Sequence, residues 1–354
     1  MSKRVIAGQP KINIGGEIPE EDIEHFEIRA DLDQPDMAEI SLSNIGSRYT
    51  RQIKPGTTVT VKMQMEGEEE DELFKGRVTG INPIWDIKRA VSLKVWAMND
   101  LHKLARERKT RTFVQRTVKQ IVETIAGEHG LSAKFGKEPP TLKLDHLHQN
   151  NVTDLAYLRW LAARTGREIL VEDNTLYFRK PEKDQGPIMT LDFTEEGKET
   201  NVDYLSLMLS VANQVQKVTV RGWDPDKKEV IVGEATNSPG LGGRGGGSAF
   251  SDAPNLQFFD VPVRSKEEAD LIAKSIMEER QMSYIMGQGT ARGNGKIRPG
   301  VMIQVKCTDP AFDGKYQVSS VRHSYAHSSG GLGTGATMGG YRTQFQLRRD
   351  ASSS

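Results

Sequence analysis

Two histidines in the middle of the chain have the spacing of metal ligands. In the segment Asp145-His146-Leu147-His148, the rings of His146 and His148 would lie on one side of a strand, and imidazole is a common Zn²⁺ ligand. No cysteine or suitably spaced histidine nearby completes a site. We therefore interpret the pair as exposed polar residues ahead of a helix, and we expect neither a metal nor any other cofactor.

Two glycine-rich runs could in principle hold a phosphate. They span residues 240–248 and 328–335. A phosphate loop also needs a preceding strand, a Gly-Lys-Ser/Thr ending and a following helix that points its dipole at the anion. Neither run has these features, so we interpret both as flexible loops, with Arg244 as a solubilising charge.

No arrangement of nucleophile and base stands out. The single cysteine, Cys307, excludes an intramolecular disulfide framework, suits a reducing cytosol and is interpreted as a small apolar strand residue. Carboxylate pairs such as Glu20-Glu21 and the acidic loop 66–72 are interpreted as solvated surface. No Ser-His-Asp or Cys-His order is evident. The sequence therefore predicts no active site, and the protein is expected not to be an enzyme.

Charge and length limit the remaining classes of function. The 354 residues carry 48 Lys plus Arg and 48 Asp plus Glu, so no whole-chain field would attract nucleic acid, and we expect no nucleic-acid recognition. The amino terminus lacks a signal-peptide pattern, and no stretch reaches the roughly 18 apolar residues of a membrane helix. We expect two to four domains, no membrane anchor and assembly in the cytoplasm.

One stretch of the chain occurs twice and organises the rest. Residues 53–62 and 297–306 each place a basic residue and a Pro-Gly turn before an alternating strand. Downstream, Phe74-Lys75-Gly76 is matched with Phe312-Asp313-Gly314, and the first copy has the acidic loop 66–72 as an insertion. Two unrelated hairpins are the alternative, but the shared order favours one barrel-like module present twice. Val59 and Ile303 should then face the two interiors, and the acidic loop should be dispensable.

The predicted fold class is α+β and rich in strands, with three segments. Residues 1–100 read as the short strands of a first β-barrel. Residues 101–182 read as a small α+β insert, with helices from Thr117 to Gly130 and from about Asn151 to Gly166, then a hairpin around Asp173-Asn174. Residues 183–354 read as a second barrel, which includes a strand at 216–223 and a helix capped by Ser265.

Several motifs resemble one family of tail proteins. The segment from Asn151 to Ala162, followed by Gly166 and Leu176-Tyr177-Phe178, resembles part of phage late control protein D and of the hub-like N-terminal part of VgrG spike proteins. The ending agrees, through Arg298-Pro299-Gly300, 312–316, 321–325 and 340–345. Each motif is weak alone, and their common order over residues 5–349 is the specific signal.

This resemblance implies a structural baseplate hub with two tube-like β-barrels per chain. Three chains would give six similar barrels, so that a homotrimer could join a sixfold inner tube to a threefold spike and help to initiate tube assembly. The implied partners are the inner tube protein, a separate spike protein and baseplate wedge proteins, in a phage tail or injection particle assembled in the bacterial cytoplasm. A phage tail, a bacteriocin and an extracellular or intracellular injection system all remain open.

Two other functions are alternatives to a structural hub. A particle-associated cell-wall hydrolase would need a carboxylate or histidine site in a cleft. A receptor-binding or carbohydrate-binding tail module would need aromatic residues beside the glycine-rich loops, where only Phe250 and Tyr341 lie.

Overall fold

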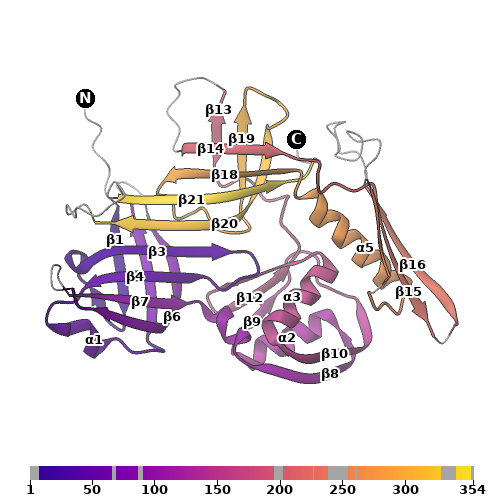
Figure 1. Ribbon diagram of the computed structural model, residues 1–354, viewed down its shortest axis with the longest axis horizontal. Coiled ribbons are helices and arrows are strands. Elements are labelled where there is room, and N and C mark those ends of the chain that lie inside the picture. The colour runs from indigo at the N-terminus through magenta and orange to yellow at the C-terminus, as the bar shows by residue number, and fades with distance from the viewer. Residues whose placement is uncertain are drawn as a thin grey trace.

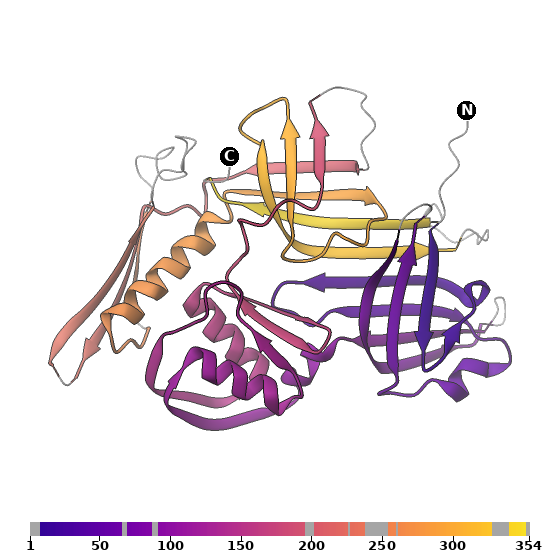
Figure 2. The same ribbon diagram turned by 180° about the vertical axis from the view of Figure 1, so that it is seen from behind.

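A computed structural model describes residues 8–65, 69–86, 91–194, 202–225, 227–237, 254–259, 261–327 and 340–351. The chain forms one long main sheet and two smaller units that combine strands with helices, the first with two small sheets and the second with one (Figures 1 and 2). The predicted α+β, strand-rich class is therefore confirmed. The glycine-rich runs 240–248 and 328–335, with Arg244 and Phe250, lie outside the described residues.

The main sheet contains two sets of strands. The first set is β1 (Gln9–Ile14), β2 (Glu17–Ile18), β3 (Ile23–Asp31), β4 (Met37–Ser43), β5 (Thr58–Gln64), β6 (Glu70–Ile84) and β7 (Ser92–Met98), with the short helix α1 (Arg48–Gln52) before β5. The second set is β13 (Thr190–Phe193), β14 (Val202–Leu209), β18 (Ile285–Arg292), β19 (Met302–Cys307), β20 (Gly314–Ala326) and β21 (Gly340–Arg349).

The two sets have the same order of neighbours. Hydrogen-bonded neighbours run β3-β4-β7-β6-β5-β1 in the first set and β14-β18-β21-β20-β19-β13 in the second. The chain also visits corresponding strands in the same sequence, apart from a segment inserted between β14 and β18. They differ at one end, because β1 pairs antiparallel with β5 whereas β13 pairs parallel with β19.

The Pro-Gly turns make the same hydrogen bonds in both sets. The Gly56 amide donates to the Val78 carbonyl (2.8 Å), and the Gly300 amide donates to the Val318 carbonyl (2.8 Å). In turn, the Val78 amide donates to the Thr57 carbonyl (2.8 Å), and the Val318 amide donates to the Val301 carbonyl (2.9 Å). The two glycines have φ of 90° and 89°, which only glycine adopts readily. Two unrelated hairpins would not share these bonds.

The ladders share two register shifts as well. One falls in β6–β7 and β20–β21, and the other in β3–β4 and β14–β18. The shifts lie between Val78 and Gly80, Val318 and Ser320, Ile23 and His25, and Val202 and Tyr204. A bulge is a local, defined feature of a strand pair, so its recurrence at matching positions supports duplication of the whole strand set.

The downstream part of the sequence match was wrong by two residues. The ladders place Gly76 opposite Val59, but they place Tyr316 opposite Ile303, which occupies the position of Val59. Gly314 is thus two residues away from the position of Gly76. A shift of two keeps every side chain on the same face of a strand, so the alternation of polar and apolar residues could not reveal the error.

Each strand set has its own apolar core. Val59 and Ile303 are both fully buried in these cores, as expected from the alternation. Part of the acidic loop belongs to the fold, which corrects the expectation of a solvated segment. Residues 66–68 lie outside the described residues, but Glu70, Asp71 and Glu72 are strand residues of β6 paired with β5. Deleting 66–72 would therefore remove part of a ladder.

The first smaller unit is the predicted insert, with more strand than expected. It comprises β8 (Arg108–Thr117), α2 (Val118–Glu128), β9 (Ser132–Lys134), β10 (Lys143–Thr153), α3 (Asp154–Thr165), β11 (Glu168–Glu172) and β12 (Thr175–Arg179), after a 3₁₀ turn at Asp100–Ala105. The capping box of Thr117 and Gln120, the left-handed Gly166 and the turn at Asp173-Asn174 are all present. The paired strands β8 and β10 were not predicted.

The second smaller unit projects from the main sheet as an arm. It consists of β15 (Lys217–Asp224), β16 (Glu229–Thr236) and β17 (Asn255–Phe258), covered on one face by α5 (Lys266–Gln281), whose N-cap is Ser265 as predicted (Figures 1 and 2). The strand expected at 216–223 therefore belongs to this separate three-stranded sheet and not to the second strand set. This three-stranded sheet forms a core of its own with α5.

Candidate assembly surfaces

The long strand β20 joins the two strand sets into one sheet. Its first part, residues 314–317, pairs with β19, and its later part, residues 320–326, pairs with β3 of the first set. Across this junction Phe26 stacks on Tyr325, with ring centroids 5.5 Å apart. The junction is thus an ordinary antiparallel ladder with an aromatic pair facing the first core.

His323 is buried at this junction. Its Nδ1 lies 2.8 Å from the Tyr341 hydroxyl and 3.2 Å from the Thr343 hydroxyl. Burial, with a smaller contribution from Arg298, lowers the pKa of His323 from 6.5 to about 3. The imidazole therefore stays neutral in the folded chain at any pH at which the protein would ordinarily be handled.

This burial predicts a loss of stability in acid. The unfolded chain takes up a proton on His323 below pH 6.5 while the folded chain does not, so its contribution is lost as pH falls from 6.5 toward 3. The expected slope approaches about 1.4 kcal/mol per pH unit. Burial of Asp36 raises its pKa to about 7 and acts in the opposite direction. Denaturant unfolding of the wild type and His323→Gln at pH 7.5, 6 and 4.5 isolates the histidine, and parallel pH profiles would refute the prediction.

Besides its ends at β2 and β13, the main sheet has two open edges among the described residues. β14 is a terminal strand and pairs only with β18. The end of β6, residues 80–84, pairs with β7 on one side and with no described strand on the other. In the alignment of the two sets, β14 corresponds to β3 and the end of β6 corresponds to the end of β20. β3 and the end of β20 are the two sides of the junction.

Large apolar side chains are exposed at both open edges. On β14, Tyr204 and Met208 are 52% and 56% exposed, and Leu209 is exposed beside them. Trp85, directly after β6, is 68% exposed and occupies the position that Tyr325 holds in the junction. Its aromatic ring therefore lacks the counterpart that Phe26 supplies to Tyr325. Neighbouring exposed apolar groups, such as those on β14, are typical of contact surfaces, and the sequence did not reveal them because exposure cannot be read from alternation.

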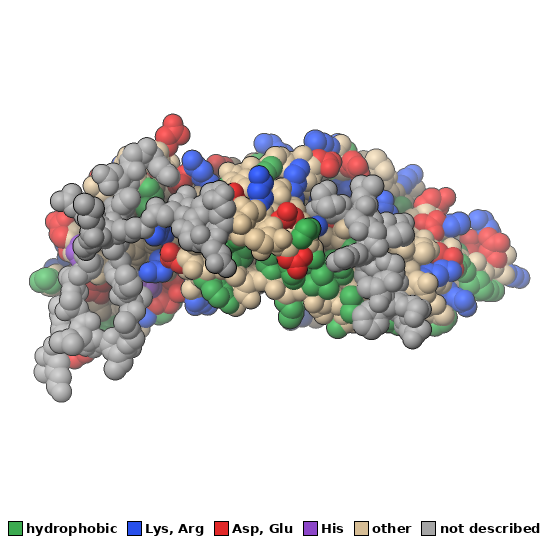
Figure 3. Space-filling model, turned by 90° about the horizontal axis from the view of Figure 1, so that it is seen from above, with side chains coloured by type: hydrophobic (Ala, Val, Ile, Leu, Met, Phe, Trp, Pro, Cys, Tyr) green, Lys and Arg blue, Asp and Glu red, His purple; other side chains and the backbone are tan. Residues whose placement is uncertain are grey.

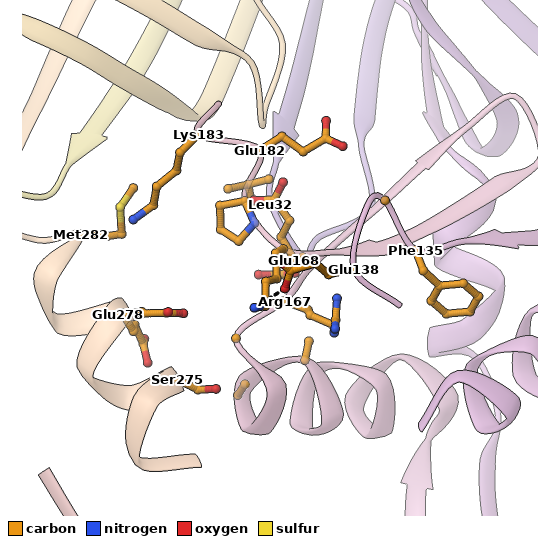
Figure 4. A pocket seen from close by; sticks show the side chains of 18 of the residues that line it. Leu32, Phe135, Glu138, Arg167, Glu168, Glu182, Lys183, Ser275, Glu278 and Met282 are labelled. Atoms are coloured by element: carbon orange, nitrogen blue, oxygen red, sulfur yellow. Dashed lines mark hydrogen bonds and ion pairs between the residues drawn. The ribbon is translucent and has the colours of Figure 1, made fainter. Parts of the chain in front are cut away.

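A pocket lies between the insert, the arm and the turn that follows β3. It has a volume of about 630 Å³, and Figure 4 shows Ser275 and Glu278 reaching it from α5 while Phe135 and Glu138 line the opposite side. Lys180 pairs with Glu138 at 2.6 Å. Nε and Nη1 of Arg167 are buried without a hydrogen-bond partner in the described chain.

The lining of this pocket includes carboxylates, among them Asp33 and Glu168, whose pKa values are raised by burial. No histidine or cysteine is among the residues that line it. Ser275, the one lining serine, donates its hydroxyl to backbone carbonyls of Leu271 (2.9 Å) and Arg164 (3.2 Å), so no base activates it. The unpartnered guanidinium nitrogens of Arg167 could hold an anion in this pocket.

The residues singled out from the sequence are not brought together. His146 and His148 are exposed on β10, the strand that leads directly into α3, as interpreted from the sequence, and His148 Nδ1 lies 2.9 Å from the Thr112 hydroxyl. Cys307 lies in β19, partly buried, as expected, and Glu20 and Glu21 lie in a surface 3₁₀ turn, where Glu20 is exposed. Within the described ranges, no group of three His, Cys, Asp or Glu could hold a metal, and no described helix could cross a membrane. Charges of both signs are interspersed over the face seen in Figure 3.

A family model described as the Alg8 N-terminal domain matches residues 33–327. The chain belongs to the Alg8 N-terminal domain family. No protein of curated function matches it.

Solved structures show the same fold in proteins of tails and injection machines. A tail protein of Neisseria meningitidis MC58 aligns with a TM-score of 0.71 and 14% identity, covering 97% of each chain. An Escherichia coli component of the type VI secretion system, described as structurally similar to the T4 tail proteins gp27 and gp5, aligns at 0.58 and 14%, covering 94% of this chain and 75% of its own. A chain of the Francisella PdpA–VgrG complex aligns at 0.55 and 8%, covering 97% and 58%. At these identities the likeness concerns the fold, and it confirms the resemblance to tail-hub and VgrG proteins.

Proposed function

We propose that this chain is a structural baseplate hub of a contractile tail or a related injection particle, in which three copies close a ring. The observation that carries the proposal is the match between the junction and the open edges. One chain already joins its second strand set to its first through β20 and β3. The open end of β6 corresponds to the end of β20, and the open strand β14 corresponds to β3. The end of β6 in one copy can therefore pair with β14 of a second copy, which repeats the junction head to tail.

The internal junction gives the register of this contact between chains. In the junction, Ser320 pairs with Asp31 and Ala326 pairs with His25. Carried over through the shared bulges, this register places Asn82 opposite Met208 of the neighbouring chain, and Trp85 opposite its Leu205. Trp85 would then be covered as Tyr325 is covered by Phe26.

Repetition of one contact around an axis gives a closed ring with heterologous interfaces. Three chains contribute six strand sets, so the ring can match a sixfold tube on one face and a threefold spike on the other. The inner tube protein, a separate spike protein and peripheral wedge proteins are the partners of such a hub, and the insert and the arm, which interrupt the repeat, are the parts available to wedges. In this proposal, the barrel segments are 1–100 and 183–354, the second of them interrupted by the arm, the insert is 101–182, and assembly takes place in the bacterial cytoplasm without enzymatic activity.

Cysteine cross-linking tests the register directly. Asn82→Cys and Met208→Cys, introduced together into a Cys307→Ser background, should form a disulfide between chains. In the carried-over ladder this is a non-hydrogen-bonded pair, whose Cα atoms are close enough to be bridged. Mild oxidation of concentrated protein should yield a covalent trimer on a non-reducing gel.

Matched variants make the outcome specific. Either single cysteine alone should give no trimer, and Asn82→Cys with Tyr204→Cys, which is out of register by four residues, should cross-link much less. A covalent dimer that never extends to a trimer, or equal cross-linking by the out-of-register pair, would contradict the proposed ring.

A further inference from the structure

A proline is the penultimate residue of β6 and lies on its open edge. Pro83 pairs with Leu93 of β7, and Ile84 ends the strand. Proline has no backbone N–H, so within sheets it is tolerated where its nitrogen faces away from a ladder. The effect of Pro83 on pairing at this edge therefore depends on whether its nitrogen faces β7 or the open side of β6.

The second strand set shows the direction of that nitrogen. At the junction, the Leu32 amide donates to the Ser319 carbonyl (3.1 Å) and the His327 amide donates to the Glu24 carbonyl (3.0 Å). Backbone groups of the odd-numbered residues from Ser319 to His327 thus face β3, because successive residues of a strand point to opposite sides. His323 is one of them, and Pro83 occupies its position in β6 after alignment of the bulges.

Pro83 therefore removes a hydrogen-bond donor from the outward row of the β6 edge. Pairing with a complete edge costs one hydrogen bond, whereas pairing of two β6 edges with each other costs two, one from each chain. β14 carries no proline, and its donor row is complete. We propose that Pro83 is the residue that determines which edges pair, by disfavouring a symmetric β6–β6 dimer relative to the head-to-tail contact with β14.

The expected size of this selection follows from the hydrogen bonds. A net hydrogen bond changes an association constant by about fivefold. Pro83 thus lowers head-to-tail association about fivefold and β6–β6 association about 25-fold. The proposal rests on the ring described above for its biological meaning, but its effect on β6 pairing is measurable without the ring.

Sedimentation velocity of the full-length chain tests the inference. Pro83→Ala should strengthen dimerisation by roughly an order of magnitude over the wild type across a concentration series. Pro83→Val, which also restores the donor and favours a strand, should act in the same way and covers the case in which the alanine variant folds poorly. Pro139→Ala, a change at an exposed proline in a loop of the insert, is the matched control and should sediment as the wild type.

A second substitution identifies the edge that forms the dimer. Leu209→Pro removes one donor from the outward row of β14 at an exposed position, so adding it to Pro83→Ala should weaken a head-to-tail dimer about fivefold and leave a β6–β6 dimer unchanged. An unchanged dimer supports the proposal, and its weakening, or sedimentation of both Pro83 variants as the wild type, overturns it. A dimer here without the Asn82–Met208 cross-link would refute the ring and leave the role of Pro83 standing.

Discussion

Val59→Lys should leave the chain without a stable first strand set. The Val59 side chain is fully buried in the first core, where an ammonium group has no described carboxylate partner and must be desolvated. Burial of an unpaired charge costs several kcal/mol, which is comparable to the whole stability of a domain. Ile303→Lys should do the same to the second set, because Ile303 holds the equivalent position and is equally buried.

Thermal unfolding followed by circular dichroism measures this effect. The expected result is loss of the cooperative transition, or a fall in Tm well above 10 °C. Thr58→Lys and Gln304→Lys, next to these positions on the opposite strand face, are matched controls and should unfold nearly as the wild type does. A Val59→Lys protein that melts with its controls would show that this face of β5 is not a core.

Asp154→Ala should be the most damaging single change in the insert. Asp154 is 1% exposed and accepts hydrogen bonds from Lys109 (2.7 Å), Arg111 (2.8 Å), His129 (2.8 Å) and Gln149 (2.9 Å). Burial favours its neutral form, but the hydrogen bonds from Lys109, His129 and Gln149 hold its pKa below the ordinary value. Its removal leaves partly buried cations facing one another, and breaking a buried pair in this way costs about 3–5 kcal/mol.

Denaturant unfolding of the full chain, compared with Glu128→Ala, tests the prediction. Glu128 contacts the same Lys109 and Arg111 but is 35% exposed, so its loss should cost about 1 kcal/mol or less. Asp154→Asn, which keeps the shape but not the charge, should lie between the two. Equal midpoints for Asp154→Ala and Glu128→Ala would show that the burial of Asp154 has no energetic consequence.

Local chemistry explains what the sequence could predict. The Pro-Gly turns, the capping box at Thr117, the stop at Gly166 and the hairpin at Asp173-Asn174 each depend on neighbouring residues, and each is present in the structure. Helix caps and turns are chosen by a few adjacent side chains. The presence of two related strand sets was therefore visible before their arrangement in space was known.

The missed features depend on distant partners. β8 was not predicted because Arg108–Thr117 is polar on nearly every position, and the strand is held by pairing with β10 and by Lys109 and Arg111 at Asp154. The arm was merged with the second strand set because β15 alternates like its neighbours in the chain. Open edges and the meaning of Pro83 require knowledge of which strands fail to find a partner, which no local pattern contains.

The junction of β20 with β3 sets a condition on synthesis. The strand that completes the second edge of β3 is made about 300 residues later, so at roughly 5–20 residues per second a nascent chain carries this open edge of β3 for some 15–60 s. Contacts this distant in sequence also slow folding after release. A ribosome-bound or truncated chain that ends before β20 should thus expose a strand edge that can capture other chains. Expression of such fragments should require chaperones that the full chain does not.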